Sequence, residues 1–313
     1  MLGFLYNQFF NMLRYKQLKI YTQYITIMIL LYIESNWEKD HIIKYVLQDV
    51  RFTNYFVIAR EHLTESFVDR IRKMSSDVVL VFSSNNVNYT TAEWLARTLK
   101  PKFIIHNSDE FGGRDEFFQL SSHVSLIIMQ YAFHYNLPPN VMHLPVAYLP
   151  GVHAGGVPDW DSIKPTNERK YDWAFVGSLK SDRAYAIRTF KERWTDATFF
   201  EGKATQIELG DTYKNTRFVI SPRGNANLMC CRTFEAITCG AIPVIANCSK
   251  EEVERTYNFS DRPIPFVYAR TWEDAVDLCR SIQNLDEIQQ RCIDWYQSIH
   301  ESIRTEIQHA ICE

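Results

Sequence analysis

Several short motifs that mark common enzyme classes are missing from this 313-residue sequence. It contains no G-x-G-x-x-G, so the main sequence evidence for a dinucleotide-dependent oxidoreductase is missing. The zinc-protease pattern H-E-x-x-H, the P-loop and the hydrolase pattern G-x-S-x-G are absent as well. The seven cysteines include no C-x-x-C pair. We therefore expect reduced thiols, with neither a disulfide framework nor a zinc site.

A long apolar run and a strong charge of one sign are also missing. The cleanest apolar run near the N-terminus, residues 25–33, has about nine residues, whereas a membrane-spanning helix needs ~20. Its β-branched and aromatic residues favour a buried strand, so we expect no stable membrane span. The formal net charge of −3 gives no electrostatic reason to expect a nucleic-acid partner.

Short apolar runs alternate with helical stretches along most of the chain, which is typical of βαβ units and parallel sheets. The strand-like runs of the first half are residues 25–33, 54–59, 77–83, 101–107, 123–129 and 140–149. Those of the second half are residues 172–178, 197–202, 217–222, 241–247 and 265–269, and helices are expected over 271–282 and 285–311. Between the halves, prolines and glycines interrupt the pattern. We expect two Rossmann-like domains, an N-terminal one (1–150) and a C-terminal one (171–313), joined by a linker (151–170).

The stretch 217–247 joins two strand-like runs through a turn and a short amphipathic segment. Pro222 cannot donate a hydrogen bond to a sheet, so the first strand stops there, and Gly224 permits a tight turn. Arg223 then points off the edge of the sheet. The helix that follows supplies unpaired N–H groups and the positive end of its dipole, which together favour an anion.

Two arginines and one carboxylate surround the start of this helix. Arg223 and Arg232 suit a diphosphate, because an arginine can grip phosphate with two charge-assisted hydrogen bonds. Glu235 lies on the same helical face as Arg232 and can accept from two vicinal hydroxyls, as on a ribose. The alternative is a surface ion pair of Arg232 and Glu235 beside a solvated Arg223. Gly240 favours the interpretation as a binding site over the surface ion pair, because it ends the helix and leads at once into a buried strand.

A second turn of interest follows the strand-like run at 172–178. Gly177 lets a phosphate approach the backbone closely, Ser178 can donate a hydrogen bond, and Arg183 adds positive charge, as does Lys180. The alternative is an ordinary connection between a strand and a helix. In a doubly wound fold both turns lie at the carboxyl ends of strands, where ligands bind.

The turn that contains Arg223 and the helix that follows it resemble a known family motif. The pattern SPRGN…CRTFEAITCGAIPVI (residues 221–245) resembles the C-terminal motif of the exostosin-like glycosyltransferases, family GT47 with the GT-B fold. Within the family, the chain most resembles the compact enzymes of large algal viruses, some of which are xylosyltransferases. The resemblance implies an α/β fold of two Rossmann-like domains whose parallel sheets face a cleft, followed by C-terminal helices.

The resemblance also implies roles for single residues. In the family, the motif arginine meets the nucleotide diphosphate and the helix glutamate holds the ribose, and these roles match Arg223 and Glu235. Arg232 matches the basic position close to the aromatic residue of the motif. Gly177 lies in the first strand–helix turn of the nucleotide domain, so the expected donor site comprises Gly177, Ser178, Arg183, Arg223, Arg232 and Glu235.

An acceptor site is expected at residues 104–116, where a buried strand runs into a cluster of charges. Inverting transfer needs a general base that takes the proton of the attacking hydroxyl. Asp109 is the first candidate, Glu110 the second, and Glu34 at the end of the first strand a third. The alternative is that these acidic groups only cap a helix and pair with nearby arginine. His106 is expected to be a packed residue at the end of its strand.

The resulting functional hypothesis is inverting transfer of a sugar, with xylose one candidate, from a UDP-sugar to a hydroxyl of an oligosaccharide or glycoprotein glycan. The alternatives are an epimerase-type enzyme that modifies a nucleotide sugar and a non-catalytic binding protein. No metal or other cofactor is expected, because helix dipole and arginines can stabilise the departing diphosphate. The sequence DWD (159–161) is read as part of the linker. The expected location is the cytoplasm, of a host cell if the source is viral, or the Golgi lumen if an anchor was trimmed.

Overall fold

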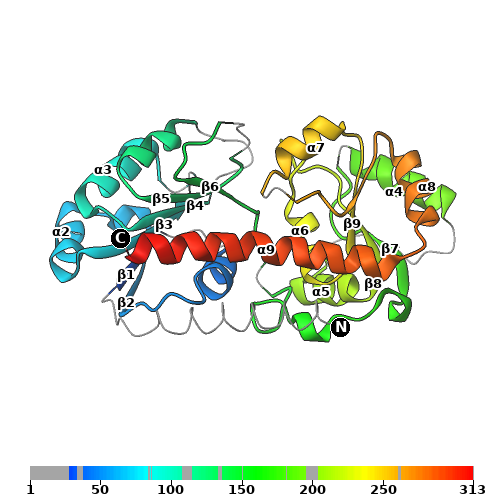
Figure 1. The fold of residues 1–313 in the computed structure, drawn as a ribbon, viewed down its shortest axis with the longest axis horizontal. Helices are drawn as coiled ribbons and strands as arrows, with labels where there is room; N and C mark the ends of the chain where they lie inside the picture. The colour runs from blue at the N-terminus through cyan, green and yellow to red at the C-terminus, as the bar shows by residue number, and fades with distance from the viewer. Residues whose placement is uncertain are drawn as a thin grey trace, which may run out of the picture.

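The computed structural model describes residues 28–33, 38–83, 85, 87–107, 115–132, 136–149, 151–180, 182–194, 204–259 and 262–312. Figure 1 shows two lobes, each built around a β-sheet, with one long helix running across both. All paired strands are parallel in both sheets. The α/β architecture predicted from the sequence is therefore confirmed.

The first sheet has six strands in the order β2-β1-β3-β4-β5-β6. They are β1 (Met28–Ile33), β2 (Asn54–Ile58), β3 (Asp77–Ser83), β4 (Phe103–Asn107), β5 (Leu126–Gln130) and β6 (Val141–Leu144). Each of the six strand-like runs of the first half of the sequence thus forms a strand. The chain leaves β1 on one side for β2 and returns on the other for β3, so the strand order reverses at β1. In sheets of this kind a crevice opens beyond the carboxyl ends of the strands at such a point.

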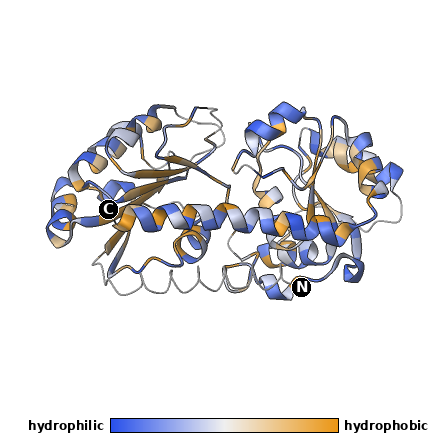
Figure 2. Cartoon of the chain, in the orientation of Figure 1, coloured by the Kyte–Doolittle hydropathy of each residue, from blue (hydrophilic) through white to orange (hydrophobic). Residues whose placement is uncertain are grey.

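Helices cover both faces of the first sheet. They are η2 (a π-helix, His41–Val46), η3 (Arg60–His62), α2 (Glu65–Met74), α3 (Tyr89–Leu99) and η4 (Asp115–Ser122). Successive side chains of a strand point to opposite faces, and β1 shows this directly. Leu30 and Tyr32 belong to the core that includes η2, whereas Ile29 and Leu31 belong to the core that includes α2 and α3. Figure 2 shows the strands of this sheet as hydrophobic.

The second sheet has four strands in the order β10-β9-β8-β7. They are β7 (Tyr171–Ala174), β8 (Thr216–Ile220), β9 (Ile242–Ile245) and β10 (Val267–Tyr268). Four of the five strand-like runs of the second half are confirmed, and the fifth, residues 197–202, lies outside the described residues. The helices of this half before the last are α4 (Asp182–Arg193), α5 (Gln206–Lys214), α6 (Cys231–Thr238), α7 (Lys250–Thr256) and α8 (Trp272–Ser281).

Two of these helices, α5 and α7, were not expected from the apolar pattern. Their N-termini carry recognisable caps instead. The Thr205 side chain accepts from the Glu208 N–H, and the Glu208 carboxylate accepts from the Thr205 N–H, which completes a capping box at α5. Ser249 caps α7 in the simpler way, by accepting from the Glu252 N–H. A search for caps would have found both helices.

The last helix, α9 (Leu285–Cys312), ties the two lobes together, and it confirms the expected C-terminal helix. Its 28 residues span roughly 42 Å at 1.5 Å per residue. Its first half packs on α6 and β9, and its second half packs on β4, β5 and η2. Ile299, Ile303 and Ile307 are about 1% exposed and join one apolar core with residues of both sheets. None of the helices in the described part of the chain is long and apolar enough to cross a membrane.

In its described residues, 145–149 and 151–170, the segment from β6 to β7 contains no strand and only two short 3-10 turns, η5 (Trp160–Ser162) and η6 (Thr166–Glu168). Arg169, 3% exposed, fastens its end to the second sheet. The Arg169 guanidinium donates to the carbonyls of Tyr213 (3.1 Å) and Thr216 (2.8 Å), and also to that of Cys239 (3.2 Å). This arginine therefore satisfies carbonyls where α5 and α6 end.

Candidate active site

The carboxyl ends of β7 and β8 and the start of α6 form the expected donor site. Ser221, directly after β8, is fully buried, and its hydroxyl lies 2.8 Å from that of Thr233 in α6. The Thr233 hydroxyl also lies 3.2 Å from that of Tyr257. The turn between strand and helix closes through the Gly224 N–H, which donates to the Asn227 carbonyl at 2.8 Å. These contacts fix α6 against the end of the strand.

Arg232 is buried at the base of this site, with 8% of its surface exposed. Its Nε donates to the Val176 carbonyl at 3.3 Å, and its Nη1 donates to the Cys230 sulfur, also at 3.3 Å. The guanidinium lies over the Phe175 ring, 4.8 Å from the ring centre. A guanidinium has five N–H groups, and these two bonds are the only ones Arg232 makes among the described residues. The expected alternative, a surface pair with Glu235, does not apply because both side chains are buried.

Gly177 covers the Arg232 guanidinium. Its φ of +143° is one that other residues rarely adopt, and a Cβ there would lie 3.0 Å from Nη2 of Arg232. Ser178 and Lys180, which follow it, are exposed. The turn after β7 and the start of α6 thus lie against each other.

Arg223 and Arg183 add positive charge at the same edge. Nη2 of Arg223 donates to the Asn247 carbonyl (3.2 Å) and pairs with Glu252 of α7 (3.0 Å). Both arginines act on the Asp182 carboxyl, whose pKa is raised by burial and lowered in turn by their charges. Arg232 and Arg183 therefore lie close enough to the start of α6 to act on the Cys230 thiol, whereas Arg223 is half-buried and already paired with Glu252.

The Arg223→Ala variant should bind UDP roughly tenfold more weakly, at the lower end of the ~1.5–3 kcal/mol of a charged hydrogen bond. The effect is limited because the side chain is half-buried and must leave Glu252 to meet a phosphate. The matched variant Glu252→Gln keeps Arg223 and removes the competing charge, so it should bind UDP at least as tightly as the wild type. Calorimetry measures both affinities, and unchanged binding by Arg223→Ala would remove this residue from the donor site.

Glu235 lies one helical turn beyond Arg232 and is 2% exposed. Its Oε1 accepts from the Leu149 N–H at 3.3 Å. Burial raises the pKa of the Glu235 carboxyl to about 7, while the charge of Arg232 and the Leu149 N–H oppose that rise. The carboxylate predicted to hold a ribose therefore also touches the backbone that joins the two lobes.

Two adjacent thiols at the start of α6 were not anticipated as part of the site. Cys230, 7% exposed, caps the helix without a side-chain hydrogen bond to its backbone. A hydrogen bond from Cys231 lowers the pKa of the Cys230 thiol, and the nearby charges of Arg232 and Arg183 lower it further. The Cys230 sulfur is an acceptor for Arg232, a role that the prediction of reduced thiols does not include.

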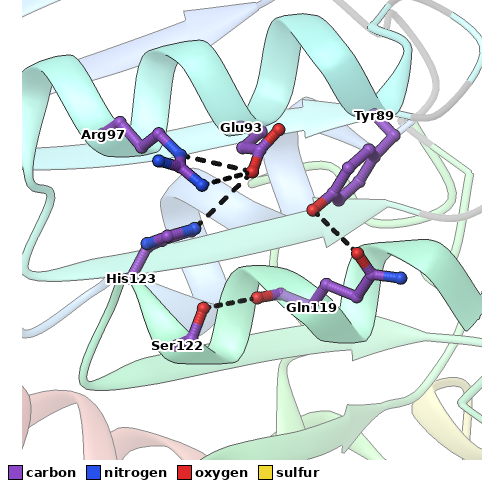
Figure 3. A network of polar contacts seen from close by, with 6 residues as sticks. All are labelled: Tyr89, Glu93, Arg97, Gln119, Ser122 and His123. Atoms are coloured by element: carbon purple, nitrogen blue, oxygen red, sulfur yellow. Dashed lines mark hydrogen bonds and ion pairs between the residues drawn. The ribbon is translucent and has the colours of Figure 1, made fainter.

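On the acceptor side, the predicted bases Asp109, Glu110 and Glu34 lie outside the described residues. His106 is a packed residue, as expected, and its ring stacks on Phe117 at 4.1 Å. The chain that follows the predicted acceptor loop is fastened to α3. Figure 3 shows how Tyr89 of α3 donates to Gln119 (3.2 Å), while Glu93 accepts from Arg97 (2.8 Å).

The structure reveals another carboxylate at this edge, Glu38, which sequence reasoning missed. Its Oε2 accepts from Gln130 Nε2 at 2.6 Å, and the Ala147 N–H is a second donor. Gln130 ends β5 and is 1% exposed. Gln130, a polar residue at the end of an otherwise apolar strand, was the available signal in the sequence. Its partner Glu38 lies 92 residues away, so the sequence does not reveal the pair.

The DWD sequence lies in the linker. Trp160 and Asp161 fall in the turn η5, and Asp159 directly precedes it. Among the described residues, no three His, Cys, Asp or Glu side chains come close enough together to hold a metal ion.

Comparison with known structures identifies the class of fold. The chain is similar to Anabaena Alr3699/HepE, solved in complex with UDP and glucose, with 9% identity, coverage of 91% of this chain and 98% of that chain, and a TM-score of 0.50. The lipopolysaccharide outer core galactosyltransferase WaaB is similar as well, with 9% identity, coverage of 92% and 99%, and a TM-score of 0.47. A comparison with curated proteins gave no match. The fold is the GT-B architecture of glycosyltransferases, as predicted.

The family follows from the sequence model of the exostosin GT47 domain, which matches residues 72–261. This range includes four strands of the first sheet (β3 to β6), the linker, and β7, β8, α6 and β9 of the second lobe. The chain therefore belongs to the exostosin GT47 family and is a glycosyltransferase.

Proposed function

We propose that this protein transfers a sugar from a UDP-sugar to a hydroxyl of a glycan acceptor with inversion at the anomeric carbon. The observation that carries the proposal is Arg232, a buried cation at the start of a helix with donors that no described residue uses. Cys230 and Glu235 offset part of the cost of burying this charge. The diphosphate of a nucleotide sugar would accept from the remaining donors.

The remaining donor-site residues fit the same ligand. Gly177 and Ser178 would let the diphosphate approach Arg232, while Arg183 and Arg223 would bind its outer oxygens. Glu235 would accept from the ribose hydroxyls after exchanging its bond to the Leu149 N–H. The Anabaena protein of the same fold was solved with UDP and glucose, which supports a uridine nucleotide here.

The chemistry requires stabilisation of the leaving group above all. As the bond between the anomeric carbon and the phosphate oxygen breaks, negative charge grows on the diphosphate. Arg232 and the positive end of the α6 dipole would stabilise this negative charge. Fixed charges stabilise a developing charge most effectively in a site with little water. A carboxylate of the first lobe would take the acceptor proton, and Asp109 is the residue predicted from the sequence.

A thermal-shift panel of UDP- and GDP-sugars tests the donor. A ligand that binds only the folded protein stabilises it by ~2.7 kcal/mol when present at a hundred times its dissociation constant. UDP, UDP-xylose or UDP-glucose should raise the melting temperature, whereas GDP-sugars should not. If no uridine nucleotide shifts the melting temperature, the proposed donor class is wrong.

Transfer should not need a metal ion, because Arg232 and the helix dipole neutralise the departing diphosphate. Activity measured as UDP release should stay within twofold of the untreated enzyme in excess EDTA. Complete loss that Mn²⁺ restores would contradict this prediction and would return attention to Asp159 and Asp161.

The same assay separates the other functions of a GT-B protein. An epimerase-type enzyme would convert the UDP-sugar fully with no acceptor present, and a non-catalytic binding protein would release no UDP at all. A transferase should release UDP slowly into water and faster with an acceptor glycan. Xylose is the sugar favoured by the resemblance to algal-virus enzymes, so UDP-xylose is the first donor to test.

A further inference from the structure

Glu38 occupies the place in the first sheet where a ligand is expected. It follows β1 by five residues, and β1 lies between β2 and β3, where the strand order reverses. Ligands of doubly wound sheets bind in the crevice beyond the strands at this reversal. Asp109, the base predicted from the sequence, follows β4 instead, which is two strands away from β1 in the sheet.

The Glu38 carboxylate is fixed by neutral donors. Gln130 Nε2 holds Oε2 from the end of β5 at 2.6 Å, and the Ala147 N–H approaches from the segment that follows β6. Tyr296 of α9 is near enough for the charge of Glu38 to raise its pKa. Glu38 forms no ion pair with any described lysine, arginine or histidine. A carboxylate without a cation keeps its affinity for a proton.

The first and second lobes meet beside this carboxylate. The Ala147 N–H donates to Glu38, and the Leu149 N–H donates to Glu235 of α6. Two residues of chain extend at most ~7 Å, so the two amide nitrogens lie within that distance of each other. Glu38 therefore reaches the same short stretch of backbone as the carboxylate proposed to hold the donor ribose.

We propose that Glu38, in place of Asp109, is the general base of the transfer reaction. This inference rests on the proposed function. The Glu38 carboxylate takes the proton of the acceptor hydroxyl, and the hydroxyl oxygen forms a bond to the anomeric carbon. The bond from that carbon to the diphosphate oxygen breaks, and its electron pair leaves with UDP. Glu38 then returns the proton to solvent, and Gln130 is the residue that positions it.

The acid–base properties of Glu38 agree with this role. Burial raises the pKa of its carboxyl to about 7, against the opposing effects of Gln130 and Ala147. A base works best when its pKa lies near the operating pH. Because only the ionised form accepts a proton, the rate should rise with pH through about 7. The effect of pH on stability is opposite to its effect on the rate. Because the pKa of Glu38 is raised in the folded protein, the contribution of this group to the free energy of unfolding is lost as pH rises through the same range.

The test compares Glu38→Gln and Asp109→Asn in the full-length protein. The probe is UDP-xylose or UDP-glucose, whichever the wild type hydrolyses faster, with water as the acceptor. UDP affinity and the melting temperature show whether each variant still folds and binds the nucleotide. Glu93→Gln is the matched control, since Glu93 is a carboxylate of α3 that pairs with Arg97 at the surface.

Glu38→Gln should bind UDP within threefold of the wild type, release UDP at least ~100-fold more slowly and lose the acidic limb of its pH profile. Glu38→Asp, which keeps a carboxylate, should recover part of the rate together with the acidic limb. Gln130→Met removes a hydrogen bond that lowers the Glu38 pKa, so its acidic limb should move to higher pH. Glu93→Gln should change neither rate nor profile.

The inference is overturned if Glu38→Gln releases UDP within tenfold of the wild-type rate with the acidic limb intact. Loss of that limb in Asp109→Asn alone would assign the base to Asp109. These results differ from a failure of the proposed function, in which the wild type itself neither binds UDP nor releases it from a UDP-sugar.

Discussion

The Arg232→Met variant should bind UDP at least ~100-fold more weakly than the wild type, a loss of about 3 kcal/mol. Methionine fills a similar apolar volume, so the helix can still pack, but the cation at its start is gone. Removing the charge also removes an effect that lowers the pKa of Glu235. Glu235 would then be protonated more often near neutral pH and would accept less well from a ribose.

Two variants make this result specific. Arg232→Lys keeps a charge but loses the planar guanidinium, so it should fall between the wild type and Arg232→Met. Arg193→Met removes an arginine from α4 that pairs with Asp277 at the surface, and it should leave UDP affinity unchanged. Calorimetry measures all three, and Arg232→Met that binds UDP within threefold of the wild type would contradict the proposed donor site.

The Arg169→Met variant should lose about 3–5 kcal/mol of unfolding free energy, because it leaves several buried carbonyls without a donor. Burial lowers the pKa of Arg169 only to about 10, so the group is charged at neutral pH and its hydrogen bonds are charge-assisted. Gly240, with a φ of +74°, leaves room for this guanidinium, and a Cβ there would lie 2.4 Å from Nη2. Arg169 therefore fastens the linker to the ends of α5 and α6.

Urea unfolding measures this loss. The control is Arg97→Met, which removes an exposed ion pair with Glu93 and should cost less than ~1 kcal/mol. Equal stability of Arg169→Met and the wild type would mean that other donors replace the guanidinium, and the linker would then be fastened in some other way.

The inner strands of the first sheet could be predicted from the sequence because their side chains are buried on both faces. β1 and β3 read as continuous apolar runs, and a run of that kind needs no information from distant parts of the chain. The end of helix α6 could also be predicted, because a glycine commonly follows the last turn of a helix. Gly240 has the positive φ of such a position. The helices α5 and α7 were missed because their apolar periodicity is weak and their caps were not considered.

The candidate site was predictable only where its residues are close in sequence. Gly177, Arg223, Arg232 and Glu235 belong to two strand–turn–helix units, and the turn chemistry places them. Glu38 could not be found in this way, because its environment comes from Gln130 on β5, from Ala147 after β6 and from α9. The burial that raises its pKa is created by tertiary packing.

Binding of a nucleoside diphosphate at the start of α6 can be seen in a crystal structure of the protein with UDP. We expect diphosphate oxygens at hydrogen-bond distance, about 2.7–2.9 Å, from the Arg232 guanidinium, with the ribose on Glu235. UDP bound elsewhere, for example in the groove between the linker and α9 that Trp160 and Gln289 line, with Arg232 untouched, would contradict it.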